Sequence, residues 1–320
     1  MMREIRKKQI IQTIQQINRM KNKVYYGKLL LLACVFLACT SEKKEKQPYK
    51  DTLAQKTTDL IQNPKKMCDS LQSFQTLTVQ GHTVDIAVPK TDKIQGNIVI
   101  LQGFAFPKDD WCKKTSLCKK ALEKGYILIM PEMGKSNYVS EFYPETRKDW
   151  QKHPQKQWLV DTLFHFLQNK YCILLPEQNN FAVGLSTGGR GVAVCALAKP
   201  DIFKAVATLS GDFDQSKIPN DKVMIGYYGE YSKFEERWKT KDNIIHQIKD
   251  WKVPVYIGHG KLDPLVPYQQ SELLYKSLQE NCPDVPVKYH LSPVHAHNYT
   301  YWESEVETVL SFFEMHKKSR

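Results

Sequence analysis

A serine set between glycines is the residue of this chain whose surroundings most clearly suit chemistry. The segment Gly184-Leu185-Ser186-Thr187-Gly188 follows a short apolar run and precedes a pattern typical of a helix. In a G-x-S-x-G turn between a strand and a helix, the glycines let neighbouring backbone pass close to a sharp, strained turn. The hydroxyl then stands at a helix N-terminus, whose dipole favours a developing oxyanion. Ser186 is therefore predicted to be a nucleophile, with an ordinary glycine-rich turn as the alternative.

Two later segments could complete a site around such a serine. Residues 259–263 read His-Gly-Lys-Leu-Asp after an apolar run, and an acid just beyond a strand can orient an imidazole. Residues 293–298 hold His295 and His297, and histidine suits taking a serine proton near neutral pH. Taken alone, an Asp in a turn or a His in a loop is more often structural. The chain order Ser, Asp, His, each beyond an expected strand, makes them a candidate set.

The elements that must position these residues are short buried strands separated by helices. Short apolar runs suit the strands of a parallel sheet, and the intervening segments have apolar residues at helical spacing. Two runs that flank Gln80-Gly81-His82 suggest an antiparallel hairpin at one edge. We therefore expect an α/β fold with a mostly parallel central sheet and helices on both faces. The expected strands are 74–79, 83–88, 97–101, 126–130, 181–185, 205–209, 255–258 and 287–291, and the expected helices are 111–124, 146–171, 188–199, 268–279 and 303–317.

Two stretches need a further remark. Within 146–171, Pro154 is expected to mark the real start of the helix, because proline is tolerated only at a helix N-terminus. Residues 212–250 break the alternation and read as an insertion or loop region near the strand ends. The aromatic residues between 227 and 238 either roof a pocket for a sugar or aryl group or pack an irregular segment, and the sequence leaves both open.

The stretch from about residue 74 to residue 316 resembles an α/β-hydrolase of the serine-esterase type. Its motifs are similar to those of the putative-esterase branch, which includes esterase D-like and acetylxylan or feruloyl esterase-like enzymes. The resemblance implies the α/β-hydrolase fold. The motifs are Gly-Leu-Ser-Thr-Gly-Gly-Arg-Gly at 184–191, Pro-Asp-Ile-Phe-Lys-Ala-Val at 200–206, Leu-Ser-Gly at 209–211, His-Gly-Lys-Leu-Asp at 259–263, and His297-Asn298 followed by Trp302.

The same resemblance assigns a catalytic role to three residues. Ser186 is implied as the nucleophile, His297 as the base and acid, and Asp263 as the carboxylate that orients the histidine. His295 is the rival base, and it fits the ending of the branch less well. The rival acids are Asp212 and Asp214, which follow the strand expected at 205–209.

An oxyanion hole is implied as well, built from two backbone N–H groups. One belongs to Thr187, the residue after the serine, and the other is expected from Phe104 in the turn after the strand at 97–101. Gln102-Gly103-Phe104 departs there from the usual His-Gly pattern. Because the hole uses backbone groups, we expect the chemistry to survive; one such donor is worth about 3 kcal/mol in the transition state.

The expected reaction is cleavage of a small-molecule carboxylic ester through an acyl-enzyme, without a metal or organic cofactor. An acylated carbohydrate is suggested by the branch and by the expected compartment, and by no particular residue. Two alternatives stay open: another acyl chemistry on the same site, as in a serine peptidase or an acyltransferase, and a binding lipoprotein without catalysis. No propeller-sized segment precedes the hydrolase region, which counts against a prolyl-oligopeptidase arrangement.

The net charge of the chain indicates where the protein is sent rather than that it binds nucleic acid. Its 320 residues have a formal net charge of +12, which invites a nucleic-acid interpretation. Residues 1–38, however, hold eight basic side chains against Glu4 alone, and four lysines lie between 43 and 50. The rest is nearly neutral, so we expect no nucleic-acid partner.

The basic front end is predicted to be an export signal. Residues 29–38 form an apolar run too short to span a bilayer, which needs ~20 residues. The run ends Phe36-Leu37-Ala38-Cys39, which resembles a bacterial lipobox and makes Cys39 the expected lipidated residue; Cys34 is its rival. A plain secretory signal and an uncleaved anchor are the alternatives, and Met20 competes with Met1 as the start.

This gives a signal peptide at 1–38, a polar tether and lead-in at 39–70 and an α/β-hydrolase domain at 71–320. The expected location is the bacterial envelope, on a membrane through the lipid. The body keeps six cysteines, whose pairing the sequence does not decide. Cys195 is expected to be a core thiol. Cys112 and Cys118 are expected on different faces of one helix and therefore unpaired.

Overall fold

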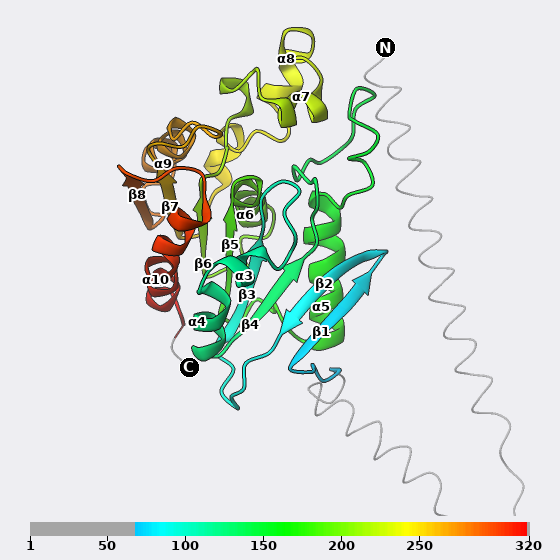
Figure 1. Ribbon diagram of the computed structural model, residues 1–320, viewed down its shortest axis with the longest axis vertical. Helices are drawn as coiled ribbons and strands as arrows, with labels where there is room; N and C mark the ends of the chain where they lie inside the picture. The colour runs from blue at the N-terminus through cyan, green and yellow to red at the C-terminus, as the bar shows by residue number, and fades with distance from the viewer. Residues whose placement is uncertain (1–67, 319–320) are drawn as a thin grey trace, which may run out of the picture. The chain divides into compact units, whose positions relative to one another are not determined.

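The computed structural model describes residues 68–318, and a single eight-stranded sheet runs through them (Figure 1). The strands are ordered β1-β2-β4-β3-β5-β6-β7-β8; β1 and β2 pair antiparallel, β2 joins β4 antiparallel, and the pairs from β4 to β8 are parallel. The predicted signal, Cys34, Cys39 and most of the predicted tether lie outside the described residues. The strands are β1 (Phe74–Val79), β2 (His82–Ala87), β3 (Gly96–Leu101), β4 (Tyr126–Pro131), β5 (Asn180–Leu185), β6 (Ala205–Leu209), β7 (Val255–Gly260) and β8 (Val287–Ser292).

The burial of each strand follows its place in the sheet. Every residue of β3, β4 and β5 is buried, as expected for apolar runs covered on both faces. The edge strand β1 alternates between exposed and partly buried side chains. The hairpin between β1 and β2 turns at Gln80 and Gly81, which both have positive φ, as a two-residue hairpin of this hand requires.

Helices cover both faces of the sheet, which confirms the predicted class. Alternate residues of one strand belong to opposite layers: Ile98 lies in one apolar cluster and Val99 in the other. One layer holds α3 (Asp110–Lys114), α4 (Leu117–Glu123) and α10 (Tyr299–Met315). The other holds η2 (Trp158–Leu163), α5 (Phe164–Tyr171), α6 (Thr187–Ala198) and α9 (Gln269–Asn281).

The segment after β6 is built from short helices, of which α7 (Lys222–Tyr228) and α8 (Tyr231–Lys239) lie beyond the carboxyl ends of the strands (Figure 1). Its aromatic residues Tyr227, Tyr228 and Trp238 are buried in a small core of their own with Val139 and Trp150. Of the two uses left open for these rings, packing is the one observed. The other helices of the segment are η3 (Gln215–Lys217) and η4 (Ile245–Asp250).

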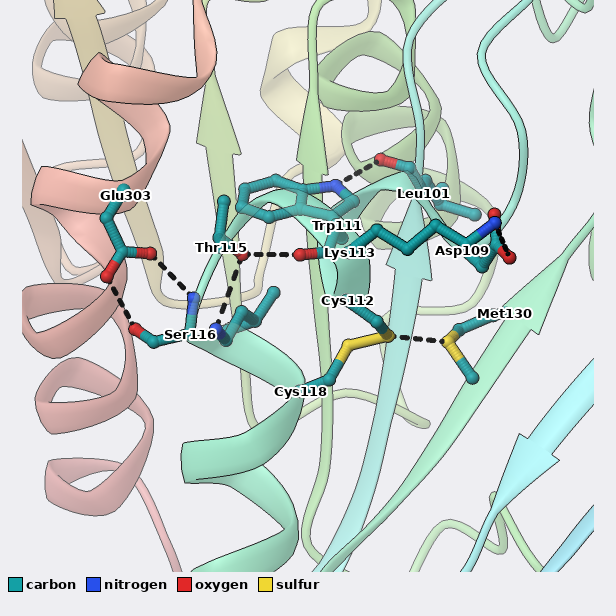
Figure 2. The surroundings of a disulfide bond; sticks show 11 residues. Leu101, Asp109, Trp111, Cys112, Lys113, Thr115, Ser116, Cys118, Met130 and Glu303 are labelled. Atoms are coloured by element: carbon teal, nitrogen blue, oxygen red, sulfur yellow. Dashed lines mark hydrogen bonds and ion pairs between the residues drawn. A yellow bond between two sulfur atoms is a disulfide. The ribbon is translucent and has the colours of Figure 1, made fainter.

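The prediction of a single helix over 111–124 is wrong, and so is the prediction that Cys112 and Cys118 are unpaired. The chain forms two helices, α3 and α4, because Thr115 adopts an extended conformation and its hydroxyl donates to the Trp111 carbonyl at 2.6 Å. Cys112 and Cys118 therefore do not share one helix, and they form a disulfide across the break (Figure 2).

The remaining helix and cysteine predictions fare better. Regular helical structure in 146–171 begins at Lys156, just after Pro154, as predicted, and continues through η2. Cys195 is a buried free thiol, which confirms its core role, and burial raises its pKa. A second disulfide joins Cys68 to Cys172, and Cys282 is free. Within 68–318, no helix is long and apolar enough to cross a bilayer.

Removing the Cys68–Cys172 disulfide should lower stability and leave the other bridge intact. The two cysteines are 104 residues apart, and closing a loop of this length constrains the unfolded chain by about 4–5 kcal/mol. We expect Cys68→Ala/Cys172→Ala to lower the free energy of unfolding by about 2–5 kcal/mol in urea titrations without reductant. Equal stability of parent and variant would contradict the bridge; the parent in reductant, which has lost both disulfides, is the reference for full reduction.

Candidate active site

Ser186 occupies a strained turn between β5 and α6. Its φ and ψ are 56° and −127°, a conformation that non-glycine residues rarely adopt. A Cβ on Gly184 would lie 2.2 Å from the Gly188 carbonyl oxygen, and one on Gly188 would lie 2.4 Å from that of Leu101. Both glycines are therefore required by close backbone contact. The predicted sharp turn is present, and it lifts Ser186 to the carboxyl end of the sheet.

His297 and Asp263 lie together at the same edge. Asp263 follows β7, His297 follows β8, and His297 Nδ1 lies 2.6 Å from Asp263 Oδ2. The other carboxylate oxygen accepts the N–H groups of Leu265 at 2.8 Å and Val266 at 2.9 Å. Because Nδ1 faces a carboxylate it carries the proton in this contact, which leaves Nε2 of a neutral imidazole as an acceptor.

The environment of Asp263 keeps it ionised. Its side chain is fully buried, and burial by itself raises the pKa of a carboxyl group. Hydrogen bonds with His259 and His297 outweigh burial and hold the pKa of Asp263 well below its usual range. The carboxylate is thus available to orient an imidazole and to stabilise it when charged.

His259 is a second histidine on the same carboxylate, and the sequence analysis gave it no role. It is fully buried, with Nδ1 2.7 Å from Ser271 Oγ and Nε2 3.2 Å from Asp263 Oδ2. Nε2 also faces the Val266 carbonyl at 3.0 Å, so Nε2 is the donor and Nδ1 accepts from the serine. Its place in the residue 259–263 motif was the available signal.

Ser186 and His297 line one cavity of about 260 Å³. Phe104, Thr187 and Asp212 also reach it, and its remaining walls are largely apolar. A larger cavity of about 370 Å³ lies near Asn97 at the amino ends of the strands and contains none of the predicted site residues. The other lining residues of the smaller cavity are Phe106, Ile218, Asp221, Val223, Met224, Leu265 and Val266.

The two predicted oxyanion donors flank this cavity. Within the described part of the chain, the N–H groups of Phe104 and Thr187 have no hydrogen-bond acceptor. The turn that carries Phe104 is fixed by Gln102, a buried side chain whose Nε2 donates to the Pro131 carbonyl at 3.0 Å. The departure from the usual histidine therefore still supplies a side-chain anchor.

The rival candidates have other partners. His295 Nδ1 lies 2.7 Å from Ser292 Oγ. Asp214 caps η3, accepting the Ser216 N–H at 3.0 Å and the Asn243 amide at 2.7 Å. Asp212 lines the cavity, but it forms an ion pair with Arg190 at 3.0 Å. None of these three described residues forms a hydrogen bond with His297, whose partner is Asp263.

Arg190 is a further residue that the sequence analysis passed over, although an arginine within an apolar helix was a visible signal. Its side chain is fully buried one turn after Ser186. Its guanidinium binds groups from several separate segments of the chain. They are the Asn137 carbonyl at 3.3 Å, Asp212 at 3.0 Å, the Gln215 amide oxygen at 3.3 Å, the Tyr228 hydroxyl at 3.3 Å and the Asp242 carbonyl.

A match over most of the chain decides its family. Residues 114–320 fit the model of the prolyl oligopeptidase family. The chain belongs to the prolyl oligopeptidase family. The matched part begins at the last residue of α3 and includes Ser186, Asp263 and His297, whereas the turn at 102–104 precedes it.

Two curated proteins are similar in sequence to this member of the prolyl oligopeptidase family. Diacylglycerol acyltransferase/mycolyltransferase Ag85C of Mycobacterium leprae (strain TN) is 24% identical over 258 residues, covering 71% of this chain and 75% of that protein. Ag85A of the same source is 24% identical over 167 residues, covering 47% of this chain and 50% of that protein. The chain thus spans three quarters of the length of Ag85C and half of the length of Ag85A.

Solved structures share the fold of this prolyl oligopeptidase family chain. S-formylglutathione hydrolase (FrmB) from Staphylococcus aureus has a TM-score of 0.61 at 19% identity, covering 76% of this chain and all of that one. A ferulic acid esterase has a TM-score of 0.58 at 16% identity, covering 77% and 98%. A puromycin-hydrolyzing peptidase from Mycobacterium tuberculosis has a TM-score of 0.57 at 17% identity, covering 77% and 40%. The predicted α/β-hydrolase fold is confirmed.

The Asp263 carboxylate should stabilise the fold in a pH-dependent way. Its folded pKa is depressed, so its contribution is present above the unfolded value of about 3.9 and is lost as pH falls further. An amide in place of the carboxylate cannot accept from all of its buried N–H partners, and each buried donor left without an acceptor costs about 1–3 kcal/mol. We expect Asp263→Asn to lose that much unfolding free energy at pH 7 and distinctly less at pH 3, in urea titrations.

Asp161→Asn is the matched control, because Asp161 pairs with Lys199 on the surface. It should change the unfolding free energy by less than about 1 kcal/mol at either pH. A loss for Asp263→Asn that stays the same at pH 3 and pH 7 would contradict the assignment.

Proposed function

We propose that this chain is a serine hydrolase that cleaves carboxylic esters of small molecules through an acyl-enzyme. Ser186 is the nucleophile, His297 the general base and acid, and Asp263 the orienting carboxylate. The N–H groups of Phe104 and Thr187 bind the oxyanion. The observation that carries the proposal is the 2.6 Å contact of His297 Nδ1 with Asp263, with Ser186 and His297 on one cavity.

The reaction follows from the roles of these groups. Ser186 Oγ attacks the ester carbonyl while His297 Nε2 takes its proton, and the carbonyl oxygen becomes an oxyanion facing Phe104 and Thr187. The tetrahedral intermediate expels the alcohol, which takes the proton from His297. A water then loses a proton to His297 and attacks the acyl-enzyme, which releases the acid and restores Ser186. Asp263 stays ionised and stabilises the imidazolium in both halves.

Replacing Ser186 should abolish ester hydrolysis. We expect Ser186→Ala to lower kcat/KM for p-nitrophenyl acetate by about 10⁴-fold or more, because the covalent route is lost. Ser304→Ala, which alters an exposed serine on α10, is the matched control and should keep parental activity. A fluorophosphonate probe should label the parent and the control only. Full activity of Ser186→Ala would sink the assignment.

Amide cleavage is the second candidate, favoured by the family that residues 114–320 match. The same acyl-enzyme chemistry applies, with an amine as the leaving group. A p-nitrophenyl ester and a p-nitroanilide with the same acyl group would separate the two. A higher kcat/KM for the anilide would favour a peptidase, and transfer of the acyl group to an added alcohol would favour an acyltransferase.

We further propose an acylated carbohydrate as the ester. The support is the sequence resemblance to acetylxylan and feruloyl esterase-like enzymes, together with the likeness of the fold to a ferulic acid esterase. A panel of acetylated and feruloylated sugars against simple alkyl esters of the same acids tests it. A kcat/KM that does not rise with the sugar present would argue against a carbohydrate.

We also propose that the chain is exported and lipidated at Cys39. The apolar run at 29–38, the small Ala38 and the charged residues that follow support this, and two disulfides suit an oxidising compartment.

Labelled palmitate should enter the parent and Cys34→Ser during expression in a bacterium, but not Cys39→Ser. The same two labelled proteins should partition into detergent. Label lost from Cys34→Ser instead would move the lipid to that residue. No label in any protein would favour a plain secretory signal.

A further inference from the structure

The indole of Trp111 is bound to the backbone that leads into the proposed oxyanion turn. Its Nε1 donates to the Leu101 carbonyl at 3.2 Å, and the ring is buried (Figure 2). β4 pairs with β3 only as far as Val99, so this carbonyl lies beyond that ladder. Leu101 still pairs with Gly184 of β5, so the indole adds a side-chain donor from α3 to a carbonyl at the end of the β3–β5 ladder.

The Leu101 carbonyl also touches the backbone on the other side of the site. A Cβ built on Gly188 would lie 2.4 Å from its oxygen and 2.5 Å from that of Gln102. Thr187, one proposed oxyanion donor, precedes Gly188, and Phe104, the other, follows Leu101 by three residues. The position of this one carbonyl therefore influences how the two donors are spaced.

The helix that carries Trp111 needs help to stay in place. α3 has only five residues, too few to be stable alone. The Cys112–Cys118 disulfide closes the break between α3 and α4 (Figure 2). Ser116, within the break, donates its N–H and its hydroxyl to Glu303 of α10, both at 2.7 Å. The indole is thus held by a covalent bridge and by a contact with α10.

We propose that Trp111 is a positioning residue for the oxyanion turn, and that the Cys112–Cys118 disulfide keeps it in register with the Leu101 carbonyl. The proposal rests on the proposed function, since it assumes that Phe104 and Thr187 bind an oxyanion. Trp111 touches no substrate and acts through backbone. Its loss should therefore weaken binding of the transition state more than binding of the substrate, and lower kcat with little change in KM.

Trp111→Phe keeps an aromatic ring and removes the donor. We expect kcat to fall about ten-fold with KM within about two-fold, because small misplacements of a catalytic group can cost up to 10²-fold. Trp251→Phe is the matched control: Trp251 is also buried and donates to the Val253 carbonyl at 2.6 Å, but it precedes β7 at the amino ends of the strands. The control should lose a similar amount of Tm and keep kcat.

The disulfide has a matched control too. Cys112→Ala/Cys118→Ala should lower kcat, whereas Cys68→Ala/Cys172→Ala, which removes the bridge at the amino ends, should lower Tm and keep kcat. Inhibition by a trifluoromethyl ketone gives an independent readout, because its adduct places an oxyanion between the two donors. Its Ki should rise by the same factor as kcat/KM falls in Trp111→Phe.

The outcomes separate this proposal from the proposed function. If Ser186→Ala is inactive but Trp111→Phe keeps parental kcat and Ki, the positioning role is overturned and the hydrolase assignment stands. If Trp111→Phe and Trp251→Phe lose kcat equally, the effect is general destabilisation and the proposal is again overturned. If Ser186→Ala is fully active, both fall together.

Discussion

A buried guanidinium has to be surrounded by hydrogen-bond acceptors. The acceptors that surround Arg190 hold together one side of the site. Removing the charge from water without partners would cost several kcal/mol. Arg190 sits one turn into the helix that follows Ser186, and its acceptors come from residues 137, 212, 215, 228 and 242. These segments contain no strand of the sheet, and their contacts with Arg190 fix them to α6. One of them contributes Asp212 to the wall of the cavity.

The buried Arg190–Asp212 ion pair contributes more to the choice of one conformation than to the free energy of unfolding. Burial raises the pKa of Asp212 even though Arg190 opposes the shift, so desolvation offsets much of the attraction. The ion pair adds geometric specificity, because the planar N–H donors of a guanidinium can bind oxygen atoms in only a few arrangements. The short helices after β6 pack their aromatic rings on each other, and the contact with Arg190 gives that small core a defined position against α6.

The parts of this architecture that depend on local pattern could be predicted. Apolar runs gave the strands, and the order of Ser186, Asp263 and His297 placed them at one edge of the sheet, where His297 and Asp263 are in contact. The parts that depend on tertiary contact could not. The break at Thr115 arises from one hydroxyl bound to a backbone carbonyl, so a helical pattern concealed a disulfide. Arg190 depends on partners from distant segments that its sequence neighbours do not reveal, whereas His259 had a local signal in its place four residues before Asp263.

The Cys68–Cys172 bridge has a mechanical consequence. Cys172 ends α5, on the side where β5 begins, whereas Ser186 follows the last residue of that strand. Six residues of strand separate the two ends, roughly 20 Å. A pull on the chain ahead of Cys68 would be borne by the bridge, the end of α5 and the sheet. Asp263 and His297 follow β7 and β8, at the opposite edge of the sheet from β1, so such a pull would reach the β5 side of the site before it reached their contact.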